Sequence, residues 1–435
     1  MNYILLISVI VILLLECILL DFDLLNPAVM ITIGWFFSSF VITIWSMFWP
    51  IKLYTNTIIF VLTSIIISFM VSCLCKVHNT DRAYSCVIEN MEDYFYISNS
   101  RTMIIIIFCI IVDIMYFSQM KSVASSISGE LDDFSSILSA YRTVTFFSGQ
   151  IKGGAAIGFF VSQLYKIVIA FGYISLFLFC KNVALGDSWL NNINFVFVMI
   201  TYLISSSLLT SRSHYINYLL SALLFMCICS GTNIKEWISN NRKAFLRILL
   251  LLIIMFFGFY TIRNLFGRNN NNSFLIYIAN YISGPLYGFN EFVHEYPRSR
   301  TGLNETFPAI QRLLMKLGEN DTAQSAQISF FYIMPGVKNN VYTALRRWLN
   351  DFGIGGMYIL QIMFSFFFCG LYRHCLIRKK DVTIVLFAYM YIATWSHFFD
   401  DLFFKTFVSV SAIIQLIIIW ACYIWITRIR FVVNH

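Results

Sequence analysis

NNVYTALRRWLNDFGIGGMYILQIMFSFFFCGLY, residues 339–372, is the stretch that decides this fold, because a polar interval ends within it and an apolar run begins. The polar interval extends from Gly267 to Asp351, in a chain that is otherwise mostly hydrocarbon. Its ionisable groups include Arg268, Glu291, His294, Glu295, Arg298, Arg300, Arg312, Lys316, Lys338, Arg346, Arg347 and Asp351. This concentration of charge in one segment predicts that the chain does its chemistry there, at a membrane surface.

The composition is that of an integral membrane protein. Of 435 residues, 59% are hydrophobic and only 12% are charged, and the mean hydropathy is +0.75. Soluble domains contain about 25% charged residues. The spans must be helices, since every backbone polar group in lipid has to be satisfied within its own segment. The net charge of +8 indicates basic loops that set orientation and contact lipid headgroups, and it does not indicate nucleic-acid binding.

Apolar runs of about 20 residues, the length that crosses a bilayer, recur along the chain. They predict an all-α polytopic membrane protein with about 11 transmembrane helices (about 10 to 13) and one large external loop that contains short helices. The predicted spans are Tyr3–Leu20, Pro27–Trp49, Thr57–Cys75, Met103–Met120, Ala155–Cys180, Ile193–Thr210, Tyr215–Ser230, Phe245–Ile262, Gly353–Tyr372, Val382–Trp395 and Phe407–Thr427. Residues 1–263 then form an N-terminal bundle, 264–352 the large loop and 353–435 a C-terminal bundle. The first run lacks a basic n-region, so we expect a span there and not a cleaved signal.

The distribution of Lys and Arg predicts the orientation of these spans. Basic residues cluster in two short loops, at residues 235–247 and 373–380, and again at the C-terminal end of the last span. Placing all three clusters in the cytoplasm puts the Gly267–Asp351 interval outside. Alternation of the spans then places the N-terminus and the Lys121–Lys152 loop outside as well.

Two segments of the interval have patterns of their own. Phe274–Val293 is nearly apolar, but Ser283-Gly284-Pro285 predicts a break, so we expect a re-entrant or interfacial segment. Asn304–Gly318 has the pattern of a short amphipathic helix that starts near a proline and stops at a glycine. Within the spans, Asp113 and Lys166 are expected to form an ion pair that fixes helix packing, the alternative being an ion relay.

Several functional classes lack support in the sequence. The interval contains no cysteine, which argues against a disulfide framework or a zinc site in it. The chain has no Walker, HExxH or GxSxG motif, so nucleotide hydrolysis and zinc proteolysis lack support. We expect neither a metal ion nor a cofactor.

Arginine is the residue type that points most directly to a ligand. Arginines on the predicted external side are Arg142, Arg212, Arg263, Arg268, Arg298, Arg300, Arg346 and Arg347. The guanidinium stays charged and its planar fork suits phosphate oxygens, so several of them around one pocket would bind a diphosphate. The alternative is that they contact lipid headgroups or ordinary carboxylates. Arg212 is favoured, because it lies in a tight turn between two spans.

Other candidates could supply a general base. His294 and Glu291 have side chains that can take a proton in a wet cleft, and the alternative is a solvated surface cluster. A further constellation runs from Asn340 through Asp351 into Gly355-Gly356, and places polar and basic groups above a helix start that permits close packing.

This last constellation carries a resemblance to a known family. Asn340-Val341-Tyr342-Thr343, followed by Asp351-Phe352-Gly353-Ile354-Gly355-Gly356, resembles the junction after the large periplasmic loop in Wzy-type O-antigen polymerases, also called oligosaccharide repeat-unit polymerases. Asn280-Tyr281-Ile282-Ser283-Gly284-Pro285 is similar to the apolar stretch early in that loop, and Ser211-Arg212-Ser213 to the arginine turn shared with O-antigen ligases. Ligases of this superfamily have a His-Asn pair where this chain has Asn339-Asn340, which disfavours a ligase.

The resemblance implies a GT-C-like, O-antigen ligase-like bundle in a bacterial inner membrane, with its active face in the periplasm. Such an enzyme transfers a growing glycan from undecaprenyl diphosphate onto another lipid-linked repeat unit. The expected catalytic residues are Arg212, His294, Glu291 and Asp351, and the expected diphosphate- or glycan-binding residues are Arg142, Arg263, Arg268, Arg298, Arg300, Asn340, Tyr342, Arg346 and Arg347. The implied partners are undecaprenyl-diphosphate-linked oligosaccharide, membrane lipid, a chain-length regulator and a flippase. The alternatives are an O-antigen ligase and a flippase or transporter of the lipid-linked unit.

Overall fold

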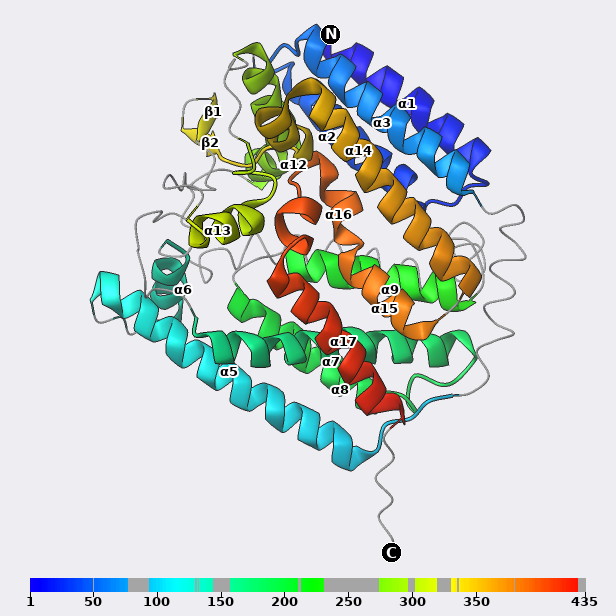
Figure 1. The fold of residues 1–435 in the computed structure, drawn as a ribbon, viewed down its shortest axis with the longest axis vertical. Coiled ribbons are helices and arrows are strands. Elements are labelled where there is room, and N and C mark those ends of the chain that lie inside the picture. The colour runs from blue at the N-terminus through cyan, green and yellow to red at the C-terminus, as the bar shows by residue number, and fades with distance from the viewer. Residues whose placement is uncertain are drawn as a thin grey trace, which may run out of the picture.

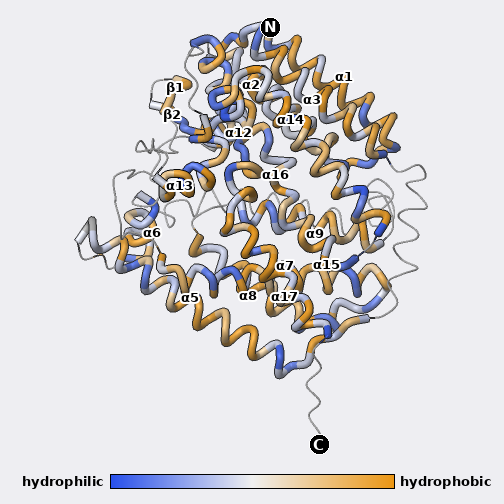
Figure 2. Tube along the Cα trace, in the orientation of Figure 1, coloured by the Kyte–Doolittle hydropathy of each residue, from blue (hydrophilic) through white to orange (hydrophobic). Residues whose placement is uncertain are grey.

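The computed structural model describes residues 1–49, 51–76, 94–129, 131, 133–143, 157–209, 213–230, 274–295, 302–318, 330–334, 336–378 and 380–428. Within these ranges the chain is almost entirely helical, with a single two-stranded hairpin. The long helices are mostly hydrophobic along their length (Figure 2). The protein is therefore an all-α, multi-pass membrane protein.

Eight helices in the described ranges are long and apolar enough to cross a bilayer. They are α1 (Asn2–Leu19), α2 (Pro27–Trp45), α3 (Thr55–Cys75), α5 (Asn99–Ser128), α7 (Phe159–Ala184), α9 (Ser213–Ser230), α14 (Ala344–Arg378) and α17 (Val410–Arg428). A shorter apolar helix, α8 (Ile193–Ser206), continues into the 3-10 turn η2 (Ser207–Leu209). All of them coincide with predicted spans, because about 20 apolar residues rising 1.5 Å each match the hydrocarbon core. The predicted span Phe245–Ile262 lies outside the described residues.

The long helices form two groups (Figure 1). In one group α3 packs along α14, and α1 packs along α2; in the other, α7 contacts α5, α8, α9 and α17. Helix α15 (Asp381–Met390) joins the groups, because it contacts α14 on one side and α9 and α17 on the other. The segment that follows α15 carries the polar residues of the candidate site.

The N-terminus and the polar interval lie at the same end of the bundle, as the predicted topology requires. The side chain of Asn2 donates to the carbonyl of Ile51 and accepts from the N–H of Leu53, both at 3.0 Å. The adjacent residue, Tyr54, donates its backbone N–H to the side chain of Asn290 in the interval, at 2.8 Å. The start of α1, the α2–α3 connection and the interval are thereby linked.

The first described element of the interval is α12 (Phe274–His294), a continuous helix that contains Pro285. The expected break at Ser283-Gly284-Pro285 is therefore wrong. Helix α12 packs along α2, and this packing outweighs the backbone hydrogen bond that proline removes. The glycine serves close approach instead, since a Cβ on Gly284 would stand 2.3 Å from Nδ2 of Asn339.

Asn339 belongs to the hairpin that covers α12. Its strands are β1 (Phe331–Met334) and β2 (Val337–Asn339), antiparallel, with Phe331 opposite Asn339. The predicted amphipathic helix is confirmed as α13 (Pro308–Lys316), followed by Gly318 at a φ of 85°. Helix α13 contacts η5 (Phe403–Phe407), a π-helical turn before α17.

The predicted span Val382–Trp395 is a broken helix. After α15 come α16 (Ile392–Trp395) and the 3-10 turn η4 (Ser396–Phe398). Gly34 on α2 permits their close approach, because a Cβ there would lie 2.6 Å from Cδ1 of Phe398. Irregular backbone at membrane depth persists only where protein or water covers it, and here α2 and α14 contact η4.

The ion pair expected between Asp113 and Lys166 is wrong. Oδ2 of Asp113 accepts from the hydroxyl of Ser205 at 2.6 Å, whereas the ammonium of Lys166 donates to the carbonyl of Ser411 at 2.9 Å. Each charged side chain is thus bound by a neutral group on a different neighbouring helix.

Helix α14 contains a kink at Gly353, where φ is 71° and ψ is −171°. This region of backbone conformation is open almost only to glycine. Residues 344–352 form a short helical segment before the kink, and the residues after it form the long span. The kink therefore sets the direction in which Arg346 and Arg347 face the interval.

Replacing Gly353 with alanine is expected to lower the free energy of unfolding by about 1–3 kcal/mol, the cost of a strained backbone conformation. Gly355→Ala is the matched control, since Gly355 is helical, nothing lies within 4 Å of a Cβ there, and alanine is the better helix former. Melting temperatures in detergent should fall for the first variant only. Equal melting temperatures would contradict the role given to the kink.

Candidate functional site

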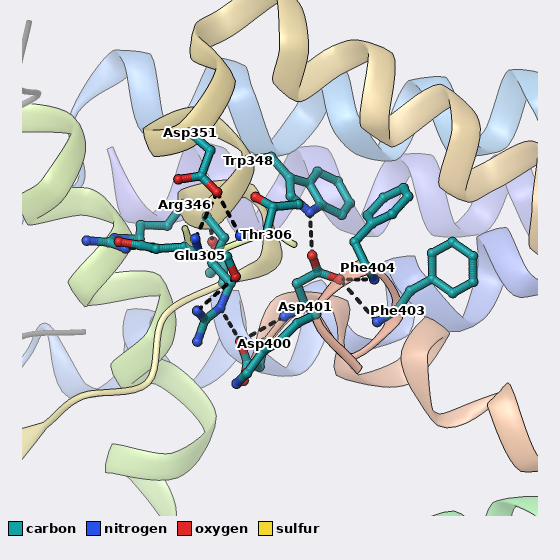
Figure 3. A network of polar contacts seen from close by, with 12 residues as sticks. Glu305, Thr306, Arg346, Trp348, Asp351, Asp400, Asp401, Phe403 and Phe404 are labelled. Carbon is teal, nitrogen blue, oxygen red and sulfur yellow. Dashed lines mark hydrogen bonds and ion pairs between the residues drawn. The ribbon is translucent and has the colours of Figure 1, made fainter. Parts of the chain in front are cut away.

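Three segments meet where α14 begins: the turn before α13, the residues of α14 that precede its kink, and the turn 399–402 with η5 (Figure 3). They bring together six charged side chains that we call the charged cluster: Glu305, Arg346, Arg347, Asp351, Asp400 and Lys405. Each of the six is buried or half-buried. Charges removed from water are costly unless paired, so their contacts define what the cluster can do.

Arg346 is held on several sides. Its Nη1 forms an ion pair with Oε2 of Glu305. The guanidinium carbon lies 4.6 Å from the ring centroid of Phe292 and 4.8 Å from that of Tyr342, and such contacts are attractive and restrict the plane of the group. The side chain is only 9% exposed, yet its buried Nε has no hydrogen-bond partner among the residues that the structure describes. One donor of a fixed, charged fork is therefore unused.

Arg347 and Lys405 share one carboxylate. Nε of Arg347 donates to Oδ1 of Asp400 at 2.6 Å, and Nζ of Lys405 donates to Oδ2 at 2.7 Å. Burial alone would raise the pKa of Asp400, but the charges of Arg347 and Lys405 outweigh it and hold the pKa at about 2. Asp400 is therefore ionised at neutral pH and holds Arg347 and Lys405 in place.

Asp401 has a different environment from its neighbour. Oδ2 accepts from Nε1 of Trp348 at 2.8 Å, and Oδ1 accepts the backbone N–H groups of Phe403 and Phe404 at 3.1 and 2.9 Å (Figure 3). Burial raises the pKa of Asp401 to about 7, against the lowering effect of the Trp348 N–H, and the charge of Asp400 adds to the rise. Asp401 thus anchors η5 to α14 and titrates near neutral pH.

This pKa predicts a pH effect on stability. Because the folded pKa lies above the ordinary value of 3.8, the contribution of Asp401 is full below about pH 4 and is lost as pH rises to about 7. The unfolding free energy of wild type minus that of Asp401→Asn should therefore fall over this window, by at most about 1.4 kcal/mol per pH unit. Denaturant unfolding in detergent at four pH values measures the difference, in which other titrating groups cancel. A difference independent of pH would contradict the assignment.

The backbone of Glu305 is held by α14. Oδ2 of Asp351 accepts the N–H groups of Glu305 and Thr306 at 3.0 and 2.7 Å (Figure 3). Nδ2 of Asn350 donates to Oε1 of Glu305 at 2.9 Å, and Nη1 of Arg347 reaches the carbonyl of Glu305 at 3.5 Å. The turn before α13 is therefore fixed, whereas the Glu305 side chain is held only by polar side chains.

A neutral polar seam continues from the cluster into the bundle. His397, which stacks edge-on against Trp348, accepts at Nδ1 from Nε1 of Trp35 (3.1 Å). Its Nε2 therefore carries the proton and donates to Oε1 of Gln361, at 2.7 Å. Ser64 on α3 also donates to this oxygen, at 2.7 Å. The seam fixes η4 against α2, α3 and α14 and so supports the turn that carries Asp400.

The structure brings some of the expected site residues together. Arg346, Arg347 and Asp351 belong to the charged cluster, and Tyr342 lies against Arg346. Asn340 precedes them and donates its backbone N–H to Oδ1 of Asn339 at 2.8 Å.

Other expected residues lie elsewhere. The ring of His294 stacks on Tyr54 with centroids 4.2 Å apart, and Glu291 accepts from Nδ2 of Asn290 at 3.3 Å. Arg142 ends α6 (Phe134–Arg142), which packs against α5. The expected residues Arg212, Arg263, Arg268, Arg298 and Arg300 lie outside the described residues.

Sequence reasoning missed half of the cluster. Asp400 and Lys405, together with His397 and Asp401, fall in SHFFDDLFFK (residues 396–405), on the predicted external side. The sequence contains a signal for these residues. The preceding predicted span is short, and ionisable residues at its end indicate a broken helix that lines a site. Glu305 carried no local signal, because it lies 41 residues from its partner Arg346.

Chemically, the cluster contains three cations, each paired with a carboxylate, and the further carboxylate of Asp351. Two guanidiniums and an ammonium stand in a water-poor site, where electrostatic interactions are strong. In the described part of the chain, no three His, Cys, Asp or Glu residues are grouped so that they could hold a metal ion. Searches of family models, curated proteins and solved structures found no match to this chain.

Proposed function

We propose that this chain is a membrane glycosyltransferase that polymerises undecaprenyl-diphosphate-linked oligosaccharide repeat units at the periplasmic face of a bacterial inner membrane. The observation that carries the proposal is the buried, pre-positioned Arg346, which has an unused donor and stands beside Arg347 and Lys405. The resemblance of the 340–356 junction to O-antigen polymerases supports the same reading.

The chemistry of such a transfer matches the charges of the cluster. A glycan leaves undecaprenyl diphosphate when the bond from its anomeric carbon to the phosphate oxygen breaks, so negative charge develops on the diphosphate. Guanidiniums already held in place stabilise that charge without reorganising, and preorganised electrostatics is often the largest catalytic contribution. The planar fork of arginine also pairs with two phosphate oxygens at once. Arg346 is therefore assigned to the diphosphate, with Arg347 and Lys405 as the adjoining positive charge.

The position of the cluster suits a substrate with a lipid anchor. It lies at the start of α14, and α14 and the helix packed along it, α3, expose large apolar side chains such as Ile359 and Ile66. A polyprenol chain can lie against such a surface in the bilayer while the diphosphate reaches the end of α14. The sugar part is then left to the interval, which includes α12, α13 and the hairpin.

Purified protein in proteoliposomes, supplied with undecaprenyl-diphosphate-linked repeat units, should produce a ladder of longer glycans on a gel. Protein that binds the lipid and never lengthens it would contradict the proposal.

Two further assays distinguish the alternatives. Transfer onto lipid A–core would favour an O-antigen ligase, and movement of labelled lipid across the bilayer without bond formation would favour a flippase. A chain-length regulator and a flippase of the same pathway are the partners to add to the reconstituted system.

A further inference from the structure

The carboxylate of Glu305 is bound to Nη1 of Arg346, at the end of the guanidinium, where a phosphate can also bind. We propose, on the basis of the function proposed above, that Glu305 is the general base of the transfer. In this arrangement the diphosphate of the donor binds Arg346 and displaces the carboxylate of Glu305. The released carboxylate then accepts the proton of the acceptor sugar's hydroxyl.

The geometry separates a fixed backbone from an exchangeable side chain. Asp351 accepts the N–H of Glu305 and that of Thr306, so the turn keeps its place whatever the carboxylate contacts. The carboxylate itself is bound by Arg346 and by Nδ2 of Asn350. Its side chain is 13% exposed, against 6% for Arg347, so it borders the accessible side of the cluster.

Arg346 is prepared for the exchange of partners. The rings of Phe292 and Tyr342 hold its plane, and within the described part of the chain its Nε has no hydrogen-bond partner. A phosphate that binds the end of the guanidinium engages Nη1 and Nη2, and it therefore competes with Glu305, whose ion pair is at Nη1. The exchange therefore replaces the carboxylate of Glu305 by phosphate oxygens at Nη1.

Loss of the Arg346 guanidinium makes the carboxylate of Glu305 a stronger base, as general-base catalysis requires. A guanidinium partner favours the ionised carboxylate and makes it a weak base, and removal of that partner raises its proton affinity. Substrate binding thus creates the base at the moment when a donor is present.

The step balances as a substitution at the anomeric carbon. The O–H proton of the acceptor sugar passes to Glu305 as the acceptor oxygen forms its bond to the anomeric carbon of the donor. The bond from that carbon to the diphosphate oxygen breaks, and undecaprenyl diphosphate leaves with the electron pair, its charge held by Arg346. Glu305 then gives its proton to water.

The other carboxylates of the site are less suited to this role. Asp400 is bound to two cations, and Asp401 accepts three N–H donors, two of them from the backbone. Asp351 holds the backbone of the turn. Releasing any of them would dismantle the structure that positions Arg346 and Arg347.

Glu305→Gln tests the assignment, because it removes the base and keeps the shape. Chain extension in proteoliposomes should slow by about 10²- to 10⁴-fold, the usual contribution of general acid–base catalysis. The dissociation constant for donor lipid should stay equal or decrease, since the competing carboxylate charge is gone. Glu305→Asp should retain part of the activity. Asp133→Asn, an exposed carboxylate at the start of α6, is the matched control and should behave as wild type.

Two results would overturn the inference. Wild-type extension by Glu305→Gln would show that the proton goes elsewhere, and loss of donor binding in parallel with activity would show that Glu305 only shapes the site. A wild-type protein that itself neither binds nor extends the donor would instead refute the proposed function, and Glu305's role with it. Melting temperatures of both Glu305 variants distinguish these results from misfolding.

Discussion

Arg346→Ala is expected to slow chain extension by at least about 10²- to 10³-fold, the cost of removing one well-placed donor to a developing negative charge. Donor lipid should also bind more weakly, because Arg346 is assigned to the diphosphate in the ground state and in the transition state. The assay is the rate of ladder growth in proteoliposomes, together with the dissociation constant for undecaprenyl-diphosphate-linked repeat unit.

Arg346→Lys is the informative companion to this variant. Lysine keeps the positive charge near Glu305 and so protects the fold, but it offers a point charge in place of a planar fork held by the rings of Phe292 and Tyr342. We therefore expect Arg346→Lys to remain folded and still to lose most activity. Full activity in the lysine variant would mean that charge alone is needed, and full activity in Arg346→Ala would remove Arg346 from the site.

Arg347→Met is expected to lower the free energy of unfolding by about 1.5–3 kcal/mol, because it removes a charge-assisted hydrogen bond to Asp400 and leaves Lys405 as the cation bound to that carboxylate. Methionine replaces the aliphatic stem, so lost packing contributes little. Denaturant unfolding in detergent, or the yield of folded protein on size-exclusion chromatography, measures the loss.

The double variant Arg347→Met with Asp400→Asn tests the cause. Removing both charges should restore most of the lost stability, because a buried pair replaced by neutral groups is often close to neutral in free energy. Lys405 is 31% exposed and can be hydrated without Asp400. A double variant as unstable as Arg347→Met would show that packing, and not the lost ion pair between Arg347 and Asp400, is responsible.

Hydropathy predicted the long helices well for a physical reason. A span such as Asn2–Leu19 or Val410–Arg428 must close its own backbone hydrogen bonds in lipid, so about 20 apolar residues admit a single structure. The same rule failed at Val382–Trp395, because irregular backbone is allowed where neighbouring helices cover it. Only tertiary contacts, such as Gly34 against Phe398, decide that.

Two predictions made from local sequence patterns, a helix break and an ion pair, were also wrong. Ser283-Gly284-Pro285 predicts a break, yet packing of the hairpin onto Gly284 accompanies an unbroken helix. Asp113 and Lys166 are opposite charges in spans, but Asp113 is bound by Ser205 and Lys166 by the carbonyl of Ser411. Pairing depends on which faces of the helices meet, and a single sequence does not contain that information.

The candidate site was half predictable. Arg346 and Arg347 stand out in the interval because paired arginines at a loop-to-span junction are costly to bury without purpose. Their carboxylate partners could not be assigned, since Glu305 and Asp400 come from segments 41 and 53 residues away. The fold brings these segments to the start of α14, and that arrangement turns surface arginines into a buried, charge-balanced cluster.

The most direct test of the central claim is the binding of the bare leaving group to the charged cluster. Native mass spectrometry of the purified protein with undecaprenyl diphosphate and undecaprenyl monophosphate, in competition, measures it. We predict that wild type retains the diphosphate in preference to the monophosphate and that Arg346→Ala loses this preference. Equal retention of the two lipids by wild type, or an unchanged preference in Arg346→Ala, would contradict the account.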